Sequence, residues 1–452
     1  MPQQRIYADI AMKGVDLVID RRQNRRYPFW RFGDDTDGSE GTGMSGIAIF
    51  GAGVSGLHLG LLLRAHDVPV TIYADKDPDA VRTSRLPNTV GHHHHTLERE
   101  RILGVHHWDA SRYGYTCHHH CVKAETDVRF RGDFDHPSSV IDYRLYLPRL
   151  MEDFVERGGE LVIQSITLDG VERLSGNYDL VVIAVGRGGI GEKLFARRAD
   201  KSPYDAPQRR LSAGIYAGIA YSEPKGVNLN ISPGHGELVE LPIFSYDGFA
   251  TALLFENRPG GGLEALVDTG YEADPAAYNA LVLRTLRDHY PMVYERVDQS
   301  EFGLWSERDI LQGALTPVVR EDYALLDSGV YAIAVGDAHT VVDPLVGQGA
   351  NSASYSAWTI GEAIIADQVY DERFCHRVAR NREEFVHSVS DWTNLMLAQP
   401  PHVLEFIGAM AQDKRLCDEF TSNFNHPDRQ VEVLATPERM HSYLARRSGV
   451  VA

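Results

Sequence analysis

The sequence predicts an α/β protein in which a doubly wound α/β domain is combined with a second domain carrying a mixed β-sheet and with a helical C-terminal region. Three observations support this prediction. A short apolar strand, a glycine-rich turn and an apolar helix follow one another over residues 46–66. A second strand, glycine-rich loop and helix span 330–367, and apolar strands such as 250–257 lie between the two units. Strands that alternate with helices in this way are typical of parallel sheets covered on both faces.

The turn at residues 51–56, GAGVSG, follows the G-x-G-x-x-G pattern of a dinucleotide-binding turn. Gly51 permits the tight turn, Gly53 lets the backbone approach a pyrophosphate, and Gly56 lets the helix pack on the strand. Val54 and Ser55 begin the helix, whose N-terminal N–H groups face the phosphates. The unit predicts bound NAD or FAD, and a glycine-rich turn without a ligand is the alternative.

The acidic residue that binds the ribose in such sites stands about 20 residues farther on, at the end of the second strand. Here that strand covers residues 68–75 and ends at Asp75. Asp75 lies close to the expected place but one position late, so the sequence leaves its contact with the ribose open.

The second unit places Asp337 at the end of an apolar strand, where a carboxylate can bind a chain of hydroxyls. The loop after it opens a helix and can offer backbone N–H groups to an electron-rich ring edge. This stretch resembles the second flavin motif of the aromatic hydroxylase class of FAD monooxygenases. The resemblance implies that Asp337 binds the ribityl chain of FAD. It also implies that the flavin ring is lined by Pro344, Gly347, Gln348, Gly349, Ala350 and Asn351.

Single-component members of that class carry a further Asp-Gly element linked to both FAD and NADPH. The matching place, residues 177–191, contains a buried strand and a glycine-rich turn but no Asp-Gly. The sequence therefore predicts a flavin site without a nicotinamide site, so that electrons arrive already on the flavin.

Composition excludes several classes of function. The formal net charge of −18 argues against nucleic-acid binding and against docking on anionic membranes. No apolar stretch approaches the length needed to span a bilayer, and no segment has the order of a signal peptide. Four cysteines in 452 residues do not form a disulfide framework, so a cytoplasmic location is expected.

Residues 1–43 differ from the rest of the chain and end in the glycine-, aspartate- and serine-rich run DDTDGSEGTG. Either they are an N-terminal extension with a linker, or Met44 is the natural start. No chemistry is expected before residue 44.

From Met44 onward the chain resembles the oxygenase component of styrene monooxygenase, a two-component FAD-dependent family that includes the indole monooxygenases. The matching stretches are GLHLGLLLRAHDVPVTIY (56–73), RLPNTVGH (85–92), DYRLYLP (142–148), SPGHGELVELP (232–242), DILQG (309–313), VDPLVGQGAN (342–351) and FTSNFNHPDRQ (420–430). The resemblance implies an epoxidase of styrene-like vinyl aromatics. A separate NADH-dependent reductase supplies reduced FAD, and O2 converts it to a C4a-(hydro)peroxyflavin.

The resemblance also implies the residues of the pocket. The pattern of the styrene type is matched by Asn88, Val90, His92, Tyr115, His118 and Ser138. Of these, Asn88 is expected near the reactive edge of the flavin, and His92, Tyr115 and His118 are expected to shape the pocket and relay protons. Apolar wall is expected from Leu86, Pro344 and Leu345. Pro87 replaces the usual Leu, and Arg85 either offsets charge on reduced flavin or is a surface residue.

Nine of the 20 histidines lie between residues 92 and 120, including the run His92 to His95. Consecutive side chains cannot all face one ion, and Cys117 and Cys121 have a spacing that is poor for zinc. We therefore predict no metal site, and we expect only His92 of the run to serve the pocket.

The expected Rossmann-like FAD-binding domain comprises 44–82, 126–200 and 315–370. The substrate domain comprises 83–125 and 201–314, and the helical region 371–452. Two further interpretations stay open: a single-component NAD(P)H-dependent aromatic hydroxylase, and a non-catalytic or metal-binding Rossmann protein. The sequence does not decide the oligomeric state, for which a homodimer is one alternative.

Overall fold

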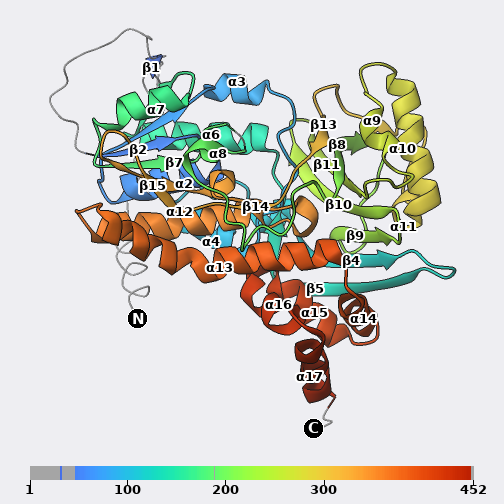
Figure 1. Ribbon diagram of the computed structural model, residues 1–452. Helices are drawn as coiled ribbons and strands as arrows, with labels where there is room; N and C mark the ends of the chain where they lie inside the picture. Colours follow the sequence, from blue (N-terminus) through green and yellow to red (C-terminus); the bar gives the residue numbers. More distant parts are fainter. Residues whose placement is uncertain (1–30, 33–45, 188, 449–452) are drawn as a thin grey trace.

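The computed structural model describes residues 31–32, 46–187 and 189–448, and its first sheet is predominantly parallel (Figure 1). The strands lie in the order β1 (Arg31–Phe32), β6 (Glu160–Ile163), β3 (Val70–Ala74), β2 (Ile47–Phe50), β7 (Leu180–Ile183), β16 (Tyr331–Ala334) and β15 (Tyr323–Leu325). All neighbouring strands are parallel except β15 and β16. The Rossmann-like part predicted from the two glycine-rich units is therefore present.

Both faces of this sheet are buried, as the continuous apolar strands predict. In β2, Ile47 and Ile49 enter one apolar core, whereas Ala48 and Phe50 enter another on the opposite face. The first core is covered by α2 (Val54–Ala65), α6 (Tyr143–Glu156) and α12 (Gly349–Ala366), and the second by α7 (Leu168–Ser175) and α8 (Ile190–Leu194).

Helix α12 packs directly on α2. A Cβ added to Gly361 of α12 would lie 2.6 Å from Leu62 Cδ2, so a larger residue there would require the Leu62 side chain to shift. Because each helix follows a strand of the same parallel sheet, both helices begin at the same edge of that sheet.

The second sheet is mixed. Its order is β12 (Gly303–Leu304), β8 (Arg210–Ala217), β11 (Gly248–Asn257), β10 (Gly236–Ser245), β9 (Val227–Ser232), β4 (Gly114–Val122) and β5 (Val128–Ser139), with β13 (Ile310–Ala314) also on β8. Only β4 and β9 pair in parallel. One face is covered by α9 (Ala265–Asp268), α10 (Pro275–His289) and α11 (Pro291–Tyr294), and the other faces the first sheet.

Several short elements lie outside the two large sheets. They are α3 (Pro78–Arg82), α4 (His94–Ile102), α5 (Ala110–Tyr113), the paired strands β14 (Val318–Val319) and β17 (Thr340–Val341), and the 3-10 turns η1 (Gly336–Ala338) and η2 (Pro344–Val346).

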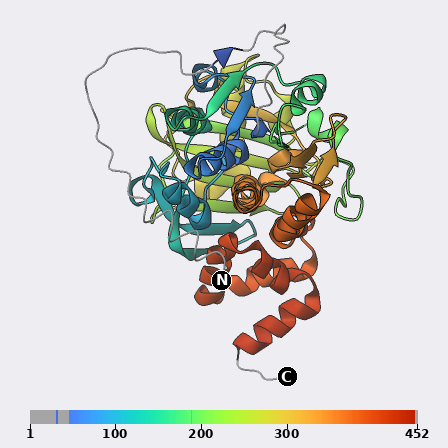
Figure 2. The same cartoon turned by 90° about the vertical axis from the view of Figure 1, so that its left-hand side faces the viewer.

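The C-terminal region is helical, as expected. It comprises α13 (Glu372–Ala398), α14 (Pro401–Met410), α15 (Lys414–Ser422), the turn η3 (Asn423–Asn425), α16 (Pro427–Leu434) and α17 (Pro437–Arg447). In Figures 1 and 2 the helices after α13 form a separate layer beside the β4–β5 hairpin. Their core contains Trp392, Phe406, Phe420 and Phe424, and Phe130 of β5 packs against it.

The predicted fold class is confirmed. Strand β5 pairs with β4 in the mixed sheet, although the boundary drawn before residue 126 put it in the FAD-binding domain. Of residues 1–43, the structure describes only Arg31 and Phe32, which pair with β6; the rest lie outside the described residues. None of the described helices is both long and apolar enough to cross a membrane.

Candidate active site

A cavity of about 610 Å³ lies between the first sheet and the mixed sheet. The first sheet contributes the starts of α2 and α12 and the loops after β7 and β16, and the mixed sheet contributes apolar side chains. A volume of this size suits a cofactor or a drug-sized ligand.

The G-x-G-x-x-G turn forms one end of the cavity. Gly51 has φ +118°, and a Cβ there would lie 2.2 Å from the Ala184 carbonyl oxygen; a Cβ on Gly56 would lie 2.0 Å from the Gly51 carbonyl oxygen. Gly51 and Gly56 therefore permit the close backbone packing of the turn but do not line the cavity. Gly53, Val54 and Ser55 line the cavity, and nothing lies within 4 Å of a Cβ added to Gly53.

The loop after β16 forms a second wall. Pro344, Leu345, Gly347, Gly349 and Ala350 all line the cavity. Gly347 adopts the left-handed conformation at φ +61°, which carries the chain from η2 into α12 without steric strain.

Helices α2 and α12 both begin at this cavity, and neither has a side-chain cap or an acidic residue in its first turn. Their free N–H groups and positive dipole ends favour negative charge at these points. The donor pattern fits the pyrophosphate and the electron-rich ring of the expected FAD.

Asp337 lines the cavity at the end of β16, as predicted. Its side chain is 41% accessible, and its Oδ2 lies 3.7 Å from Nε of Arg187. Because that accessible surface faces a recess deep in the protein, burial raises the pKa of Asp337, while Arg187 and Arg320 oppose the shift. A carboxylate held there can accept hydrogen bonds from a ligand's hydroxyl groups.

Asn88 also lines the cavity, together with Pro87 and Val90. The Asn88 Oδ1 atom is buried and has no hydrogen-bond partner among the described residues. A buried amide oxygen without a donor is costly, so this atom suits a ligand N–H or O–H group.

Tyr115 and Ser138 face each other across the β4–β5 pair, beside His93. Tyr115 and His93 line the cavity, whereas Ser138 is fully buried behind them and shares a 3.0 Å hydrogen bond with His93 Nδ1. Burial, with a smaller contribution from His92, lowers the pKa of His93 to about 3. His93 is therefore neutral in the folded protein.

His118 lines the cavity within an aromatic group. Its ring centroid lies 4.6 Å from that of Phe134 and 4.5 Å from that of Phe424, both edge-on. Burial and the neighbouring histidines hold the pKa of His118 well below its ordinary value, so this ring is also neutral.

The mixed sheet supplies an apolar wall. Its side chains in the cavity are Leu211, Ala213, Val227, Leu229, Val239, Leu241, Leu254 and Leu311. The two ends of the cavity therefore differ: one offers backbone N–H groups and a carboxylate, and the other offers a hydrocarbon and aromatic surface.

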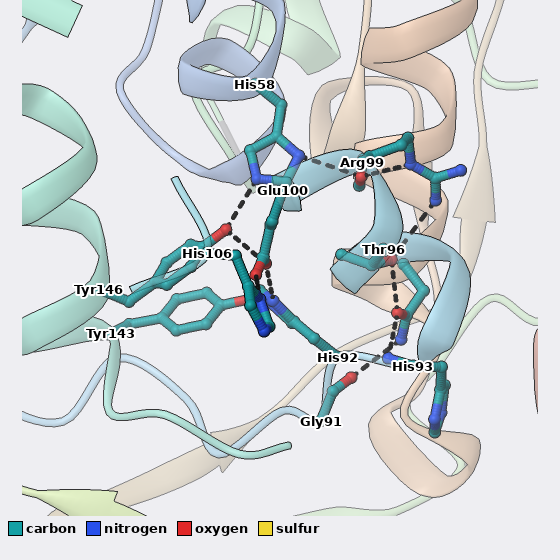
Figure 3. A network of polar contacts seen from close by, with 12 residues as sticks. His58, Gly91, His92, His93, Thr96, Arg99, Glu100, His106, Tyr143 and Tyr146 are labelled. Atoms are coloured by element: carbon teal, nitrogen blue, oxygen red, sulfur yellow. Dashed lines mark hydrogen bonds and ion pairs between the residues drawn. The ribbon is translucent and has the colours of Figure 1, made fainter. Parts of the chain in front are cut away.

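The prediction that only His92 of the run His92 to His95 serves the pocket is wrong about which ring lines the cavity. His92 does not line the cavity, and its Nδ1 and Nε2 atoms lie 2.7 Å from Glu100 Oε1 and 2.7 Å from the Tyr143 hydroxyl. His93 takes the place at the cavity. Figure 3 shows the two neighbouring rings pointing in different directions.

Asn351 and Gln348 also differ from expectation, because neither side chain lines the cavity. The Asn351 Oδ1 atom accepts from His93 N at 3.0 Å and from Thr96 Oγ1 at 2.8 Å. Its Nδ2 donates to the carbonyl oxygens of Gly91 at 2.9 Å and Gly347 at 3.0 Å. Gln348 Nε2 donates to the Phe424 carbonyl oxygen at 3.0 Å. Both amides therefore join the loops around the cavity.

Three other predicted residues lie outside the cavity lining. Leu86 is buried in the core of the mixed sheet, and Asp75 is exposed. The exposed Arg85 guanidinium pairs with Glu272, which agrees with the surface alternative. The ribose contact of Asp75 stays a prediction.

Within the part of the chain that the structure describes, no three His, Cys, Asp or Glu side chains form a group that could hold a metal ion. His94 stacks on His136 with a centroid distance of 3.8 Å, and His95 lies edge-on to His426 at 5.0 Å. All four cysteines are buried free thiols.

The cavity-lining residues that sequence reasoning did not single out include His93, Tyr143, Arg187 and Phe424. Arg187 follows β7, next to β16, so its place at the carboxyl edge of a parallel sheet was a usable signal. Phe424 lies in the C-terminal region, where no local pattern indicates contact with the site.

The chain is similar in sequence to known proteins. Residues 186–296 match the family model "Styrene monooxygenase A putative substrate binding domain". "Styrene monooxygenase StyA" of Pseudomonas fluorescens is 43% identical over 411 residues, which cover 90% of this chain and 99% of that protein.

Two solved structures share the fold. The flavin-dependent brominase Bmp2 has a TM-score of 0.61 at 15% identity, covering 90% of this chain and 99% of its own. The p-nitrophenol 4-monooxygenase PnpA from Pseudomonas putida DLL-E4 has a TM-score of 0.58 at 12% identity, covering 85% of this chain and 98% of its own.

Replacing Asn351 by Asp is expected to lower the free energy of unfolding by about 1–3 kcal/mol, because the carbonyl oxygens of Gly91 and Gly347 lose their donor. Urea unfolding measures the change. The exposed Asn177→Asp adds the same charge and is the control, with an expected change within about 0.5 kcal/mol. Equal effects of the two substitutions would contradict the role assigned to Asn351.

Neutral His93 makes stability depend on pH. The unfolded chain binds a proton at this ring below its ordinary pKa near 6.5, whereas the folded protein binds one only near pH 3, so stability falls as pH drops through this window. Urea unfolding at pH 6 and pH 5 should show a loss that is smaller in His93→Gln by up to about 1.4 kcal/mol. An unchanged loss in His93→Gln, with the exposed His376→Gln as control, would show that His93 is charged when folded.

Proposed function

This chain belongs to the styrene monooxygenase family, and we propose that it is the oxygenase component of a two-component FAD-dependent monooxygenase that epoxidises styrene-like vinyl aromatics. The observation that carries the proposal is the cavity, whose phosphate-binding end continues into an apolar end. Such a site can hold a flavin dinucleotide with its ring directed at a hydrocarbon.

The residues that would hold FAD lie on the first sheet. Gly53 to Ser55 would face the pyrophosphate, Asp337 the ribityl hydroxyls, and Pro344 with Gly347 to Ala350 the ring. When bound, the reduced flavin supplies the activated oxygen, and the protein supplies binding and orientation.

The apolar wall would hold the aromatic alkene and exclude water. Exclusion of water protects a reactive oxygen species from breakdown to hydrogen peroxide. A tenfold change in oxygen transfer relative to this loss corresponds to about 1.4 kcal/mol. Asn88 would orient the reacting groups through its unpaired Oδ1, while Tyr115 and neutral His118 shape the pocket.

Indole is a second candidate substrate, and the same Asn88 oxygen favours it. An indole N–H could donate to this buried acceptor, which the styrene vinyl group cannot do.

We further propose that a transient NADH-dependent reductase supplies the reduced FAD, since residues 177–191 lack the Asp-Gly element of single-component enzymes. The four buried free thiols are consistent with work in a reducing cytoplasm.

The deciding experiment supplies reduced FAD to the protein without oxygen, then admits O2 with styrene or indole and identifies the products. We expect an epoxide, with styrene oxide from styrene. No epoxide from either compound would refute the proposal. NAD(P)H oxidation by the pure protein with substrate, without a reductase, would instead establish a single-component hydroxylase.

Replacing Asp337 by Ala should weaken reduced-FAD binding at least tenfold, a loss of about 1.4 kcal/mol, because it removes a charged hydrogen-bond acceptor from the cavity. Anaerobic titration followed by flavin fluorescence measures the affinity. Asp327→Ala, at an exposed site outside the cavity lining, is the control. Unchanged affinity in Asp337→Ala would refute the ribityl assignment.

A further inference from the structure

A buried polar network lies directly behind the cavity, between α4 and α6 (Figure 3). Its centre is the Glu100 carboxylate, whose Oε1 atom lies 2.7 Å from His92 Nδ1 and accepts a 2.8 Å hydrogen bond from the Tyr146 hydroxyl. His92 Nε2 in turn lies 2.7 Å from the hydroxyl of Tyr143. Of the residues in this chain of contacts, Tyr143 lines the cavity, whereas His92, Glu100 and Tyr146 do not.

We propose that Tyr143, His92 and Glu100 form a proton relay in which Tyr143 donates a proton into the cavity. His92 returns a proton to the Tyr143 hydroxyl, and Glu100 orients His92. This inference rests on the proposed function for the need of a proton, but its geometry can be tested in the protein alone.

Glu100 sets the direction of the relay. Burial alone would raise its pKa, but the hydrogen bonds of His106 and His92 outweigh burial and hold the pKa of Glu100 below its usual range. An anionic carboxylate is acceptor-only, so the ring nitrogen that faces it carries a proton. In neutral His92 the proton therefore lies on Nδ1, and Nε2 is left to accept from the Tyr143 hydroxyl. This is the arrangement in which a carboxylate orients a histidine toward a hydroxyl group.

The relay has two states that differ by one proton. In the charged state, His92 donates from both nitrogens, to Glu100 and to the Tyr143 oxygen, so the Tyr143 O–H points into the cavity. Transfer of that O–H proton to an acceptor in the cavity is accompanied by transfer of the Nε2 proton to the Tyr143 oxygen. His92 is then neutral, Tyr143 remains a phenol, and a proton from solvent restores the first state.

The phenol need not ionise at any point. Burial, with contributions from Glu100 and Asp337, holds the pKa of Tyr143 well above its ordinary value. A tyrosinate is therefore unfavourable, and the hydroxyl can pass a proton only while it receives one.

The fold holds Tyr143 firmly in place. Its neighbour Arg144 is buried, and its Nη2 donates to Asp142 Oδ2 at 2.6 Å and to Asp309 Oδ1 at 2.6 Å. Asp142 also caps α6, which begins at Tyr143. This ion-pair group ties the start of α6 to the mixed sheet, so the hydroxyl keeps its position between His92 and the cavity.

The proposed reaction needs such a donor. Starting from the anionic reduced flavin, each turnover consumes one proton, because reduced flavin anion, O2, alkene and one proton balance against oxidised flavin, epoxide and water. A cavity built to exclude water cannot take that proton freely from solvent.

The first test uses the protein without flavin. NMR of protein labelled with ¹⁵N-histidine, with the His92 signals assigned by their loss in His92→Asn, shows which ring nitrogen carries the proton. We expect the neutral ring to be protonated on Nδ1, with the Nε2 signal changing in Tyr143→Phe and the Nδ1 proton retained. A neutral ring protonated on Nε2 in the unchanged protein would overturn the relay.

The second test compares two matched substitutions at saturating reduced FAD and styrene. Tyr143→Phe removes the hydroxyl that contacts His92 Nε2, on a residue that lines the cavity. Tyr146→Phe removes the other tyrosine hydroxyl of the network. We expect Tyr143→Phe to slow epoxide formation about a hundredfold and to change its pH profile and solvent deuterium isotope effect. Tyr146→Phe should slow it no more than a few-fold.

Equal losses in the two variants would show that the network is only structural and would refute the relay. Absence of epoxide from the unchanged protein would instead refute the proposed function, while the NMR result would still decide the geometry of the three residues.

Discussion

The site depends on one side chain, the amide of Asn351, which joins two segments that are distant in sequence, residues 91–96 and 347–351. Its oxygen holds the backbone at His93 and the Thr96 hydroxyl, and its nitrogen holds the Gly91 and Gly347 carbonyl oxygens. Three of these four bonds are buried, so water cannot replace them cheaply. The loop that carries Asn88, Val90 and His93 is therefore fixed against the start of α12. A shift of either loop would separate the cofactor end of the cavity from the substrate end.

The interior around Asn351 contains many buried polar side chains, although the cavity beside it must exclude water. The imidazoles of His93 and His118, which line the cavity, are neutral, whereas the anionic Glu100 lies behind them. A neutral ring can pack against hydrocarbon at far lower cost than an imidazolium. The histidine-rich segments therefore serve an apolar pocket and do not form a metal centre.

The sequence predicted best what is encoded locally. A glycine-rich turn between a strand and a helix dictates its own backbone, so Gly53 and Gly347 lie at the cavity as expected. The choice between His92 and His93 depends on a distant partner. His92 forms an antiparallel bridge with Ser139, and neighbouring residues in an extended segment face opposite sides. Without that pairing, the side that each ring faces could not be known.

The predictions for Asn351 and Gln348 were wrong for a related reason. A polar side chain in a glycine-rich loop can face a ligand or bind backbone groups, and only the tertiary contacts show which it does. The wall from β8 to β11 could be predicted as apolar strands, but their register against α2 and α12 could not. Phe424 is the extreme case, since its contact with His118 joins segments about 300 residues apart.

Because Phe424 lines the cavity, the substrate end of the pocket depends on the C-terminal helical region. The flavin-type sheet is complete once β16 has been synthesised, yet the pocket wall and the Gln348 bond to the Phe424 carbonyl require the turn η3, near the end of the chain. Phe424 is synthesised after the loops that begin α2 and α12, so the substrate end of the cavity can be completed only after its cofactor end.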